Sequence, residues 1–235
     1  MKTEVSEKKI KELTETVNQL KLLIRKQQNT VEELKSATQS AQDIEAIKKL
    51  QRAYGYYLEH WQEKELLGLW SHSPEITVEI NDSGEYKGWK NVKKYFHFPY
   101  HYSAYADLGK APPEYLHIGM PIAGIVDIDP NGKTAKGRWY GFFLIAQPRG
   151  GKFGAFVACG IWENEYIKEN GIWKLKKIFW NDIFSSPWED GWVKTPVLEN
   201  LPPKDRPAPG PNTNYLTYPS GYVFPYHYKH PVTGK

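Results

Sequence analysis

The chain has 235 residues, of which 40% are hydrophobic and 25% charged, and this suits one globular domain of about 130–150 residues with appendages. The formal net charge of +4 is small and the lysines are interleaved with glutamates, so a basic stripe that binds nucleic acid is not expected. No apolar run approaches the ~18 residues that span a bilayer, and the N-terminal region is charged. We therefore expect a cytoplasmic protein without a membrane segment.

Residues 1–41 carry a heptad repeat and form the first expected domain. The a and d positions are occupied by Ile10, Leu13, Val17, Leu20, Ile24, Gln27, Val31 and Leu34. β-Branched residues at a with leucine at d favour a parallel two-stranded coil. Leu23, at a flanking g position, widens the stripe and leaves room for three strands or for packing on the chain's own body. We expect this helix to join subunits into a homodimer or homotrimer.

Residues 42–185 are expected to form the main domain, which begins with helices. Asp43 is typical of a helix N-cap, and apolar residues spaced three and four apart predict a helix from there to Trp61. The following elements are predicted to be a short helix at 63–69, a strand at 76–80, a turn with a short strand at 84–88 and a brief helix at 90–96.

Long strands fill the second half of this domain. They are predicted at residues 116–128, 134–146, 153–169 and 172–184. Turn sequences join them, and Asn170-Gly171 is typical of a type I′ hairpin. Helices followed by a meander of strands predict an α+β fold, with the helices on one face of a curved antiparallel sheet.

Residues 186–235 form the third expected region, an extended arm. Ten of the 17 prolines lie beyond residue 186, and tyrosines are mixed with them. This density of proline is incompatible with a helix or a central strand, whereas a disordered tail is normally poor in aromatic residues. We expect the arm to lie on a surface, either of its own subunit or of a neighbour.

Four segments occur in the order found in a known family, at residues 43–54, 84–88, 134–139 and 165–175. Residues 43–184 resemble the SnoaL-like members of the nuclear-transport-factor-2-like superfamily. The ending at 224–234 is similar to the tail of a subgroup found among bacterial enzymes of aromatic-compound degradation. The resemblance implies a cone, in which a strongly bent sheet wraps on helices around an apolar pocket. Its relatives include dehydratases, isomerases, cyclases and lyases.

The same resemblance implies three catalytic residues. Tyr54 and Glu59 have the spacing of a tyrosine and an acidic residue, usually Asp, on the first helix of the dehydratase members. His117, at the start of a long strand, is similar to the histidine of the family. Apolar walls disfavour the ionised form of a carboxyl or imidazole, so its pKa moves toward neutrality. Each residue also has a structural interpretation, with Tyr54 in the core, Glu59 solvated and His117 as a sheet residue.

The expected substrate contacts are Arg138, Tyr140, Trp89, Asn181 and Tyr57. A pocket-facing Arg138 would bind a phenolate or carboxylate, although arginine is also common on the outside of a sheet. Asp182 is a weaker candidate of the same kind. Cys159, the single cysteine, lies in an apolar run and is expected to be a buried small side chain. No spacing of His, Cys and carboxylate residues indicates a metal site, and no cofactor is expected.

These residues predict a cofactor-independent lyase that dehydrates, or cleaves a C–C or C–O bond in, a hydroxylated aromatic or polycyclic molecule. Isomerisation or cyclisation in the same pocket is one alternative. A non-catalytic module for small-molecule binding or assembly is another, because folds of this kind host several functions. The identity of the substrate is left open by the sequence.

Overall fold

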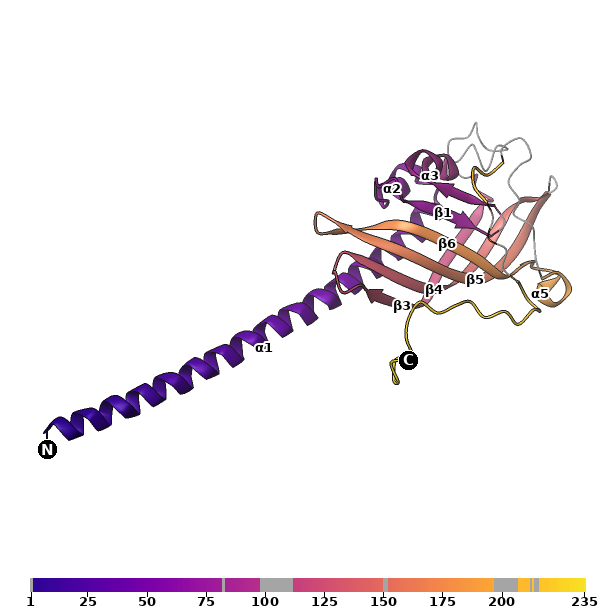
Figure 1. The fold of residues 1–235 in the computed structure, drawn as a ribbon. Coiled ribbons are helices and arrows are strands. Elements are labelled where there is room, and N and C mark those ends of the chain that lie inside the picture. Colours follow the sequence, from indigo (N-terminus) through magenta and orange to yellow (C-terminus); the bar gives the residue numbers. More distant parts are fainter. Residues whose placement is uncertain are drawn as a thin grey trace. The chain divides into compact units, whose positions relative to one another are not determined.

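The computed structural model describes residues 2–81, 83–97, 112–149, 152–196, 207–211, 213 and 216–235 (Figure 1). The chain divides into two compact units, Met1–Asp43 and Ile44–Lys235. The helices are α1 (Lys2–Glu59), α2 (Glu63–Gly68), α3 (Trp89–Phe96) and α5 (Gly191–Lys194). The strands are β1 (Thr77–Ile80), β2 (Glu85–Lys87), β3 (Leu116–Ile128), β4 (Thr134–Arg149), β5 (Lys152–Glu169) and β6 (Ile172–Pro187).

The strands form one sheet in the order β2-β1-β6-β5-β4-β3. All neighbours pair antiparallel except β1 and β6, which are parallel. The α+β class is therefore confirmed, while the expectation of a wholly antiparallel sheet is wrong at this one pair. β1 and β6 are far apart in the sequence, so no hairpin turn fixes their relative direction.

Short turns hold the meander in register. Asn170 and Gly171 have φ angles of 50° and 80°, and a type I′ turn requires positive φ at both central residues. Between β3 and β4, the N–H of Gly132 donates to the carbonyl oxygen of Asp129 at 2.8 Å. These turns confirm the two hairpins predicted from residue type.

The first helix is longer than predicted. α1 continues without interruption through Asp43, so the predicted helix start there is wrong. The Asp43 carboxylate instead accepts a hydrogen bond from Nε2 of Gln39, one turn earlier, at 3.1 Å. No proline or glycine precedes Gly55, so nothing in the sequence ends the helix at position 43. Among the described residues, no helix combines the length and the apolarity needed to cross a membrane.

The core of the second unit lies between the helices and one face of the sheet. Its buried side chains come from α1, α2, α3 and five of the strands. A polar network crosses it, in which Oε1 of Gln51 accepts hydrogen bonds from Nδ2 of Asn164 at 2.9 Å and from the Tyr166 hydroxyl at 2.8 Å. Nε1 of Trp139 donates to the same hydroxyl at 3.0 Å. Burial raises the pKa of Tyr166, so this phenol stays protonated and can donate to Gln51.

The described parts of the C-terminal region follow the sheet as an extended segment. The N–H of Glu85 in β2 donates to the carbonyl oxygen of Pro211 at 2.9 Å, and that of Tyr218 to Ile183 in β6 at 2.8 Å. Phe224 is buried against the domain. Residues 197–206 of the expected arm lie outside the described residues. We call residues 207–235 the C-terminal arm.

Candidate active site

One face of the sheet is directed toward the helices, and alternation along β4 identifies its residues. Trp139 and Phe143 belong to the buried core shared with α1, α2 and α3. β4 pairs with β5 without a break in register, so successive side chains of β4 point to opposite faces. Odd-numbered residues of β4 therefore lie on the helix-facing side, which we call the inner face. Even-numbered residues lie on the outer face.

His117 lies on the inner face within a wall of aromatic rings. Its ring stacks on Phe143, with centroids 5.4 Å apart and planes inclined by 24°. Phe143 in turn contacts Trp180 and Trp162 edge-on, at 5.0 and 5.4 Å. Tyr115 packs edge-on against the imidazole at 6.2 Å. The imidazole is thus half-buried, with apolar ring surface from Phe143 and Tyr115 against it.

This environment keeps the His117 imidazole uncharged. Burial lowers the pKa of His117 from 6.5 to about 4, because the apolar surroundings disfavour the imidazolium form. Its Nδ1 atom is buried and has no hydrogen-bond partner among the described residues. A buried polar atom without a partner is uncommon in a purely structural residue. His117 therefore presents a neutral imidazole that is able to accept or donate a hydrogen bond.

The last turns of α1 lie directly against β3. A Cβ atom added to Gly55 would lie 2.8 Å from the carbonyl oxygen of Gly119, so the two backbones are in contact. Just beyond the helix, the ring of Trp61 packs edge-on against Tyr115 at 4.8 Å. The residue numbers rise along the helix while they fall along the strand, so the two segments are antiparallel here.

These two contacts enclose two of the predicted catalytic residues. Glu59, the half-buried last residue of α1, and His117 both lie between them, so the backbones at Glu59 and His117 are at the same level of the helix–strand contact. Tyr54 comes from the same part of the helix and is 3% exposed. Its ring packs edge-on against Phe96 of α3, with centroids 6.1 Å apart. Tyr54 is therefore part of the packing between α1 and α3.

A buried carboxylate occupies the inner face further along the sheet. Asp182 is 6% exposed and pairs across strands with Gly160, which lies opposite the inward-facing Gly141. One carboxylate oxygen accepts a hydrogen bond from Nε1 of Trp180 at 2.9 Å, and the other accepts one from Nδ2 of Asn81 at 2.7 Å. The sequence alone does not single out Asp182, because only the pairing of the neighbouring strands shows which face it occupies.

Comparison with known proteins identifies the family. The sequence profile described as "SnoaL-like domain" matches residues 39–178, more than half of the chain. The chain belongs to the SnoaL-like domain family. A comparison with curated proteins gives no match.

Solved structures resemble the SnoaL-like domain in fold. A candidate scytalone dehydratase from Novosphingobium aromaticivorans superposes with a TM-score of 0.52 at 14% identity, over 65% of this chain and 91% of the other. A hexachlorocyclohexane dehydrochlorinase from Novosphingobium barchaimii superposes with a TM-score of 0.50 at 15% identity, over 64% of this chain and 92% of the other. At these identities the likeness establishes the fold.

Three predicted substrate contacts of the SnoaL-like domain lie on its outer face. Arg138 and Tyr140 are even-numbered residues of β4, and Asn181 pairs across strands with Ile161, the partner of Tyr140. The structure therefore does not bring these three side chains together with His117. The two remaining candidates lie elsewhere, since Tyr57 packs against the core from α1 and Trp89 stacks on His72 at 4.3 Å.

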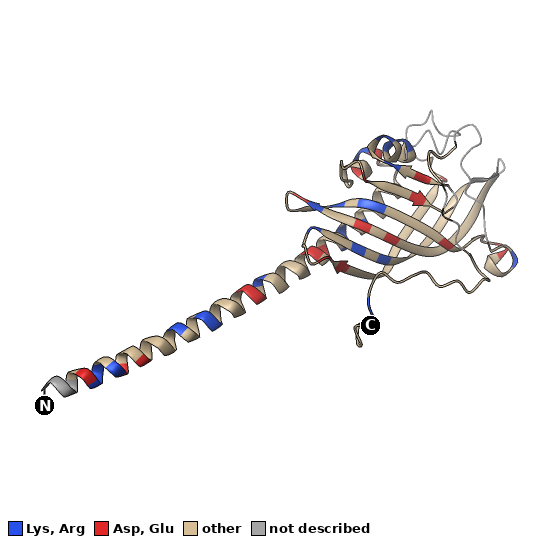
Figure 2. Cartoon of the chain, viewed as in Figure 1, with Lys and Arg blue, Asp and Glu red and all other residues tan. Residues whose placement is uncertain are grey.

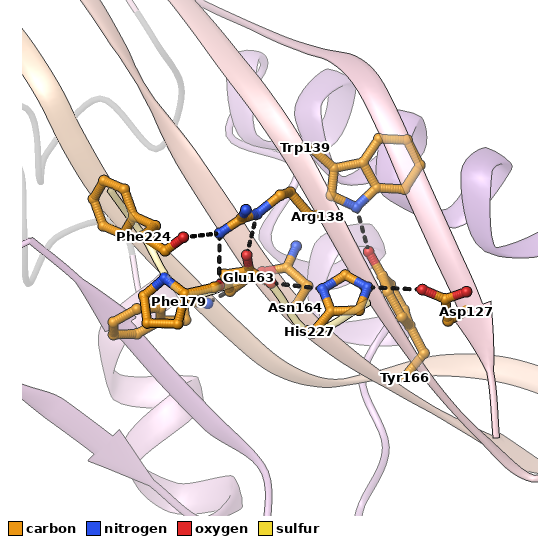
Figure 3. Close-up of polar contacts among 10 residues, drawn as sticks. Asp127, Arg138, Trp139, Glu163, Asn164, Tyr166, Phe179, Phe224 and His227 are labelled. Atoms are coloured by element: carbon orange, nitrogen blue, oxygen red, sulfur yellow. Dashed lines mark hydrogen bonds and ion pairs between the residues drawn. The ribbon is translucent and has the colours of Figure 1, made fainter. Parts of the chain in front are cut away.

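Arg138 is engaged by the C-terminal arm instead (Figure 3). Its Nη2 donates to the carbonyl oxygens of Phe224 at 3.1 Å and Pro225 at 2.8 Å, and its Nε donates to the Glu163 carboxylate. The guanidinium also lies over the ring of Tyr226, 4.6 Å from its centroid. The arm thus covers the outer face of β4 and β5 at this position.

His227 completes this outer cluster. Its Nδ1 lies 2.9 Å from Oε2 of Glu163, and its Nε2 lies 3.3 Å from Oδ2 of Asp127 (Figure 3). Two carboxylates, one guanidinium and one imidazole therefore fix the arm to the sheet. Among the described residues, no three His, Cys, Asp or Glu side chains are arranged to hold a metal ion.

Proposed function

We propose that the protein is a cofactor-independent lyase that eliminates water, or cleaves a C–C or C–O bond, in a hydroxylated aromatic or polycyclic molecule. The observation that carries this proposal is His117, a neutral imidazole with an unpaired Nδ1 on an aromatic wall. A neutral imidazole is a general base that is available at physiological pH.

In the proposed dehydration, His117 removes a proton from the carbon next to the one that bears the hydroxyl group. The electrons of the C–H bond form the new double bond, and the C–O bond breaks. The hydroxyl leaves as water after it takes a proton from the Tyr54 phenol, and the phenolate later recovers a proton from the imidazolium. The Glu59 carboxylate stabilises the imidazolium that forms transiently, because an ion in an apolar site needs an opposite charge nearby.

The substrate class follows from the rings around His117. Phe143, Trp162, Trp180 and Tyr115 provide flat apolar surface, which favours aromatic or fused-ring molecules. The two structural relatives support an elimination reaction, since their names describe a dehydratase and a dehydrochlorinase. The Asp182 carboxylate, at the other end of this wall, offers an acceptor for a substrate hydroxyl.

The test is a panel of phenolic and polycyclic alcohols, monitored in the ultraviolet for a new conjugated double bond. We expect His117→Ala to lower kcat/KM by at least about 10²-fold, because a positioned base contributes that much or more, and Tyr54→Phe to do the same. The matched control is His230→Ala, since His230 is exposed at the end of the arm. Wild-type rates in both the His117→Ala and the Tyr54→Phe variants, with the fold intact by circular dichroism, would refute the mechanism.

A further inference from the structure

The first unit, Met1–Asp43, exposes a continuous apolar stripe on α1. Its large aliphatic side chains are between 45% and 64% exposed. They are Ile10, Leu13, Val17, Leu20, Leu23, Ile24, Val31 and Leu34. An isolated helix gains most of its stability by burying such a stripe, so this surface needs a partner.

We propose that the partner is a second copy of this chain, and that the two copies form a parallel, in-register, two-stranded coiled coil over residues 10–38. The repeat puts a β-branched residue at each a position from Ile10 to Val31, and leucine at three of the four d positions. This combination favours two parallel strands over three or four.

The area of the stripe fits a stable pair. The a, d and g aliphatic side chains are about half exposed, so pairing removes on the order of 700 Å² per chain from water. A standard protein–protein interface buries about 800 Å² per partner. The coil therefore reaches the size of an interface that forms on its own.

Gln27 fixes both the direction and the register. It is the one polar residue among the eight a and d positions from Ile10 to Leu34. In a parallel in-register pair, Gln27 faces Gln27 of the second copy, and the two amides can hydrogen-bond each other. In an antiparallel pair, d positions face a positions, so Gln27 would face a β-branched aliphatic residue and leave a polar group buried without a partner.

The charges of the first unit permit this pairing. In the parallel coil each g residue faces the e residue of the following heptad, and no facing pair carries two like charges. These pairs are Lys9 with Thr14, Thr16 with Lys21, Leu23 with Gln28, Thr30 with Lys35 and Ala37 with Gln42. Between Ile10 and Val31 the acidic residues and most of the basic ones lie at the outer b, c and f positions, and Figure 2 shows both signs along α1.

The experiment compares two leucines of the same helix in the full chain. Leu20 is at a d position, whereas Leu22 is at an outward f position and is the more exposed of the two, at 65% against 52%. We expect Leu20→Glu to weaken dimerisation at least about 100-fold in sedimentation velocity over a dilution series, while Leu22→Glu leaves it unchanged. A monomeric wild type, a trimer, or equal masses for both variants would overturn the proposal.

A disulfide test determines the direction of the chains, and it stays informative if the second unit also associates. Cys159 is the only native cysteine, so each variant also carries Cys159→Ser. Under mild oxidation, Ile10→Cys is expected to form a covalent dimer, because in-register a positions face each other. Leu22→Cys is the control for random collision. No covalent dimer at position 10, or an equal yield at position 22, would overturn the parallel arrangement.

Discussion

At the scale of a single residue, His117 shows how an apolar wall changes the chemistry of a side chain. An ordinary histidine is partly protonated near neutral pH, whereas His117 has a pKa of about 4 because its ring is packed between aromatic residues. A group with this pKa remains a neutral base over the whole physiological range. The lowered pKa also destabilises the folded state at acidic pH, because the unfolded chain binds a proton at this histidine that the folded state does not bind.

The pH dependence of stability follows from that difference. The pKa of His117 is lower in the folded state than its unfolded value of 6.5, so stability that is fully present above pH 6.5 is lost as the pH falls toward 4. From pH 7 to pH 5 we expect this residue to lower the free energy of unfolding by at most about 2 kcal/mol. His117→Gln lacks this titrating group. The urea midpoint of the wild type should therefore fall more between pH 7 and pH 5 than the urea midpoint of His117→Gln. Parallel pH profiles for both proteins would contradict this assignment.

At the scale of elements, the helix–sheet contact includes a buried polar network centred on one amide. Oε1 of Gln51 on α1 receives hydrogen bonds from Asn164 and Tyr166 of β5, and all three residues are buried. The network ties the helix to the sheet two turns before Glu59. It therefore supports the position of the proposed site as well as the core.

Removing that amide should be costly. Gln51→Leu leaves two buried donors without an acceptor, and we expect a loss of about 2–4 kcal/mol in the free energy of unfolding. The control is Gln42→Leu, since Gln42 lies on the same helix and is exposed. Chemical denaturation measures both changes. Equal effects of the two substitutions would show that the network contributes nothing specific.

The arm is a second element whose attachment depends on few groups. Glu163 receives both Arg138 and His227, so Glu163→Gln removes the central negative charge of the outer cluster. Hydrogen bonds to charged groups contribute about 1.5–3 kcal/mol, so we expect amide exchange of residues 224–228 to accelerate about tenfold or more. Glu165→Gln is the control, because Glu165 lies on the same strand and pairs with Lys176. Unchanged exchange in Glu163→Gln would show that the arm is held by other contacts.

At the scale of the whole molecule, local patterns predicted the elements better than they predicted which face each residue occupies. Asn170-Gly171 and the alternating strands specify hairpins through short-range geometry, and these were confirmed. The parallel pairing of β1 with β6 depends on contacts between residues distant in sequence, which no local signal reveals. Arg138 was difficult for another reason. The arm buries the outer face, so both faces of β4 contain buried residues and alternation alone cannot distinguish them.

The contact between Gly55 and Gly119 has a further consequence for the geometry of the site. Any side chain at position 55 would act as a wedge between helix and strand, because the nearest atom is a backbone oxygen that cannot rotate away. Glu59 follows Gly55 by about one turn of α1, and His117 precedes Gly119 by two residues on β3. In the mechanism that we propose, the separation between the helix that carries Glu59 and the strand that carries His117 is therefore limited by the single hydrogen atom that position 55 has in place of a side chain.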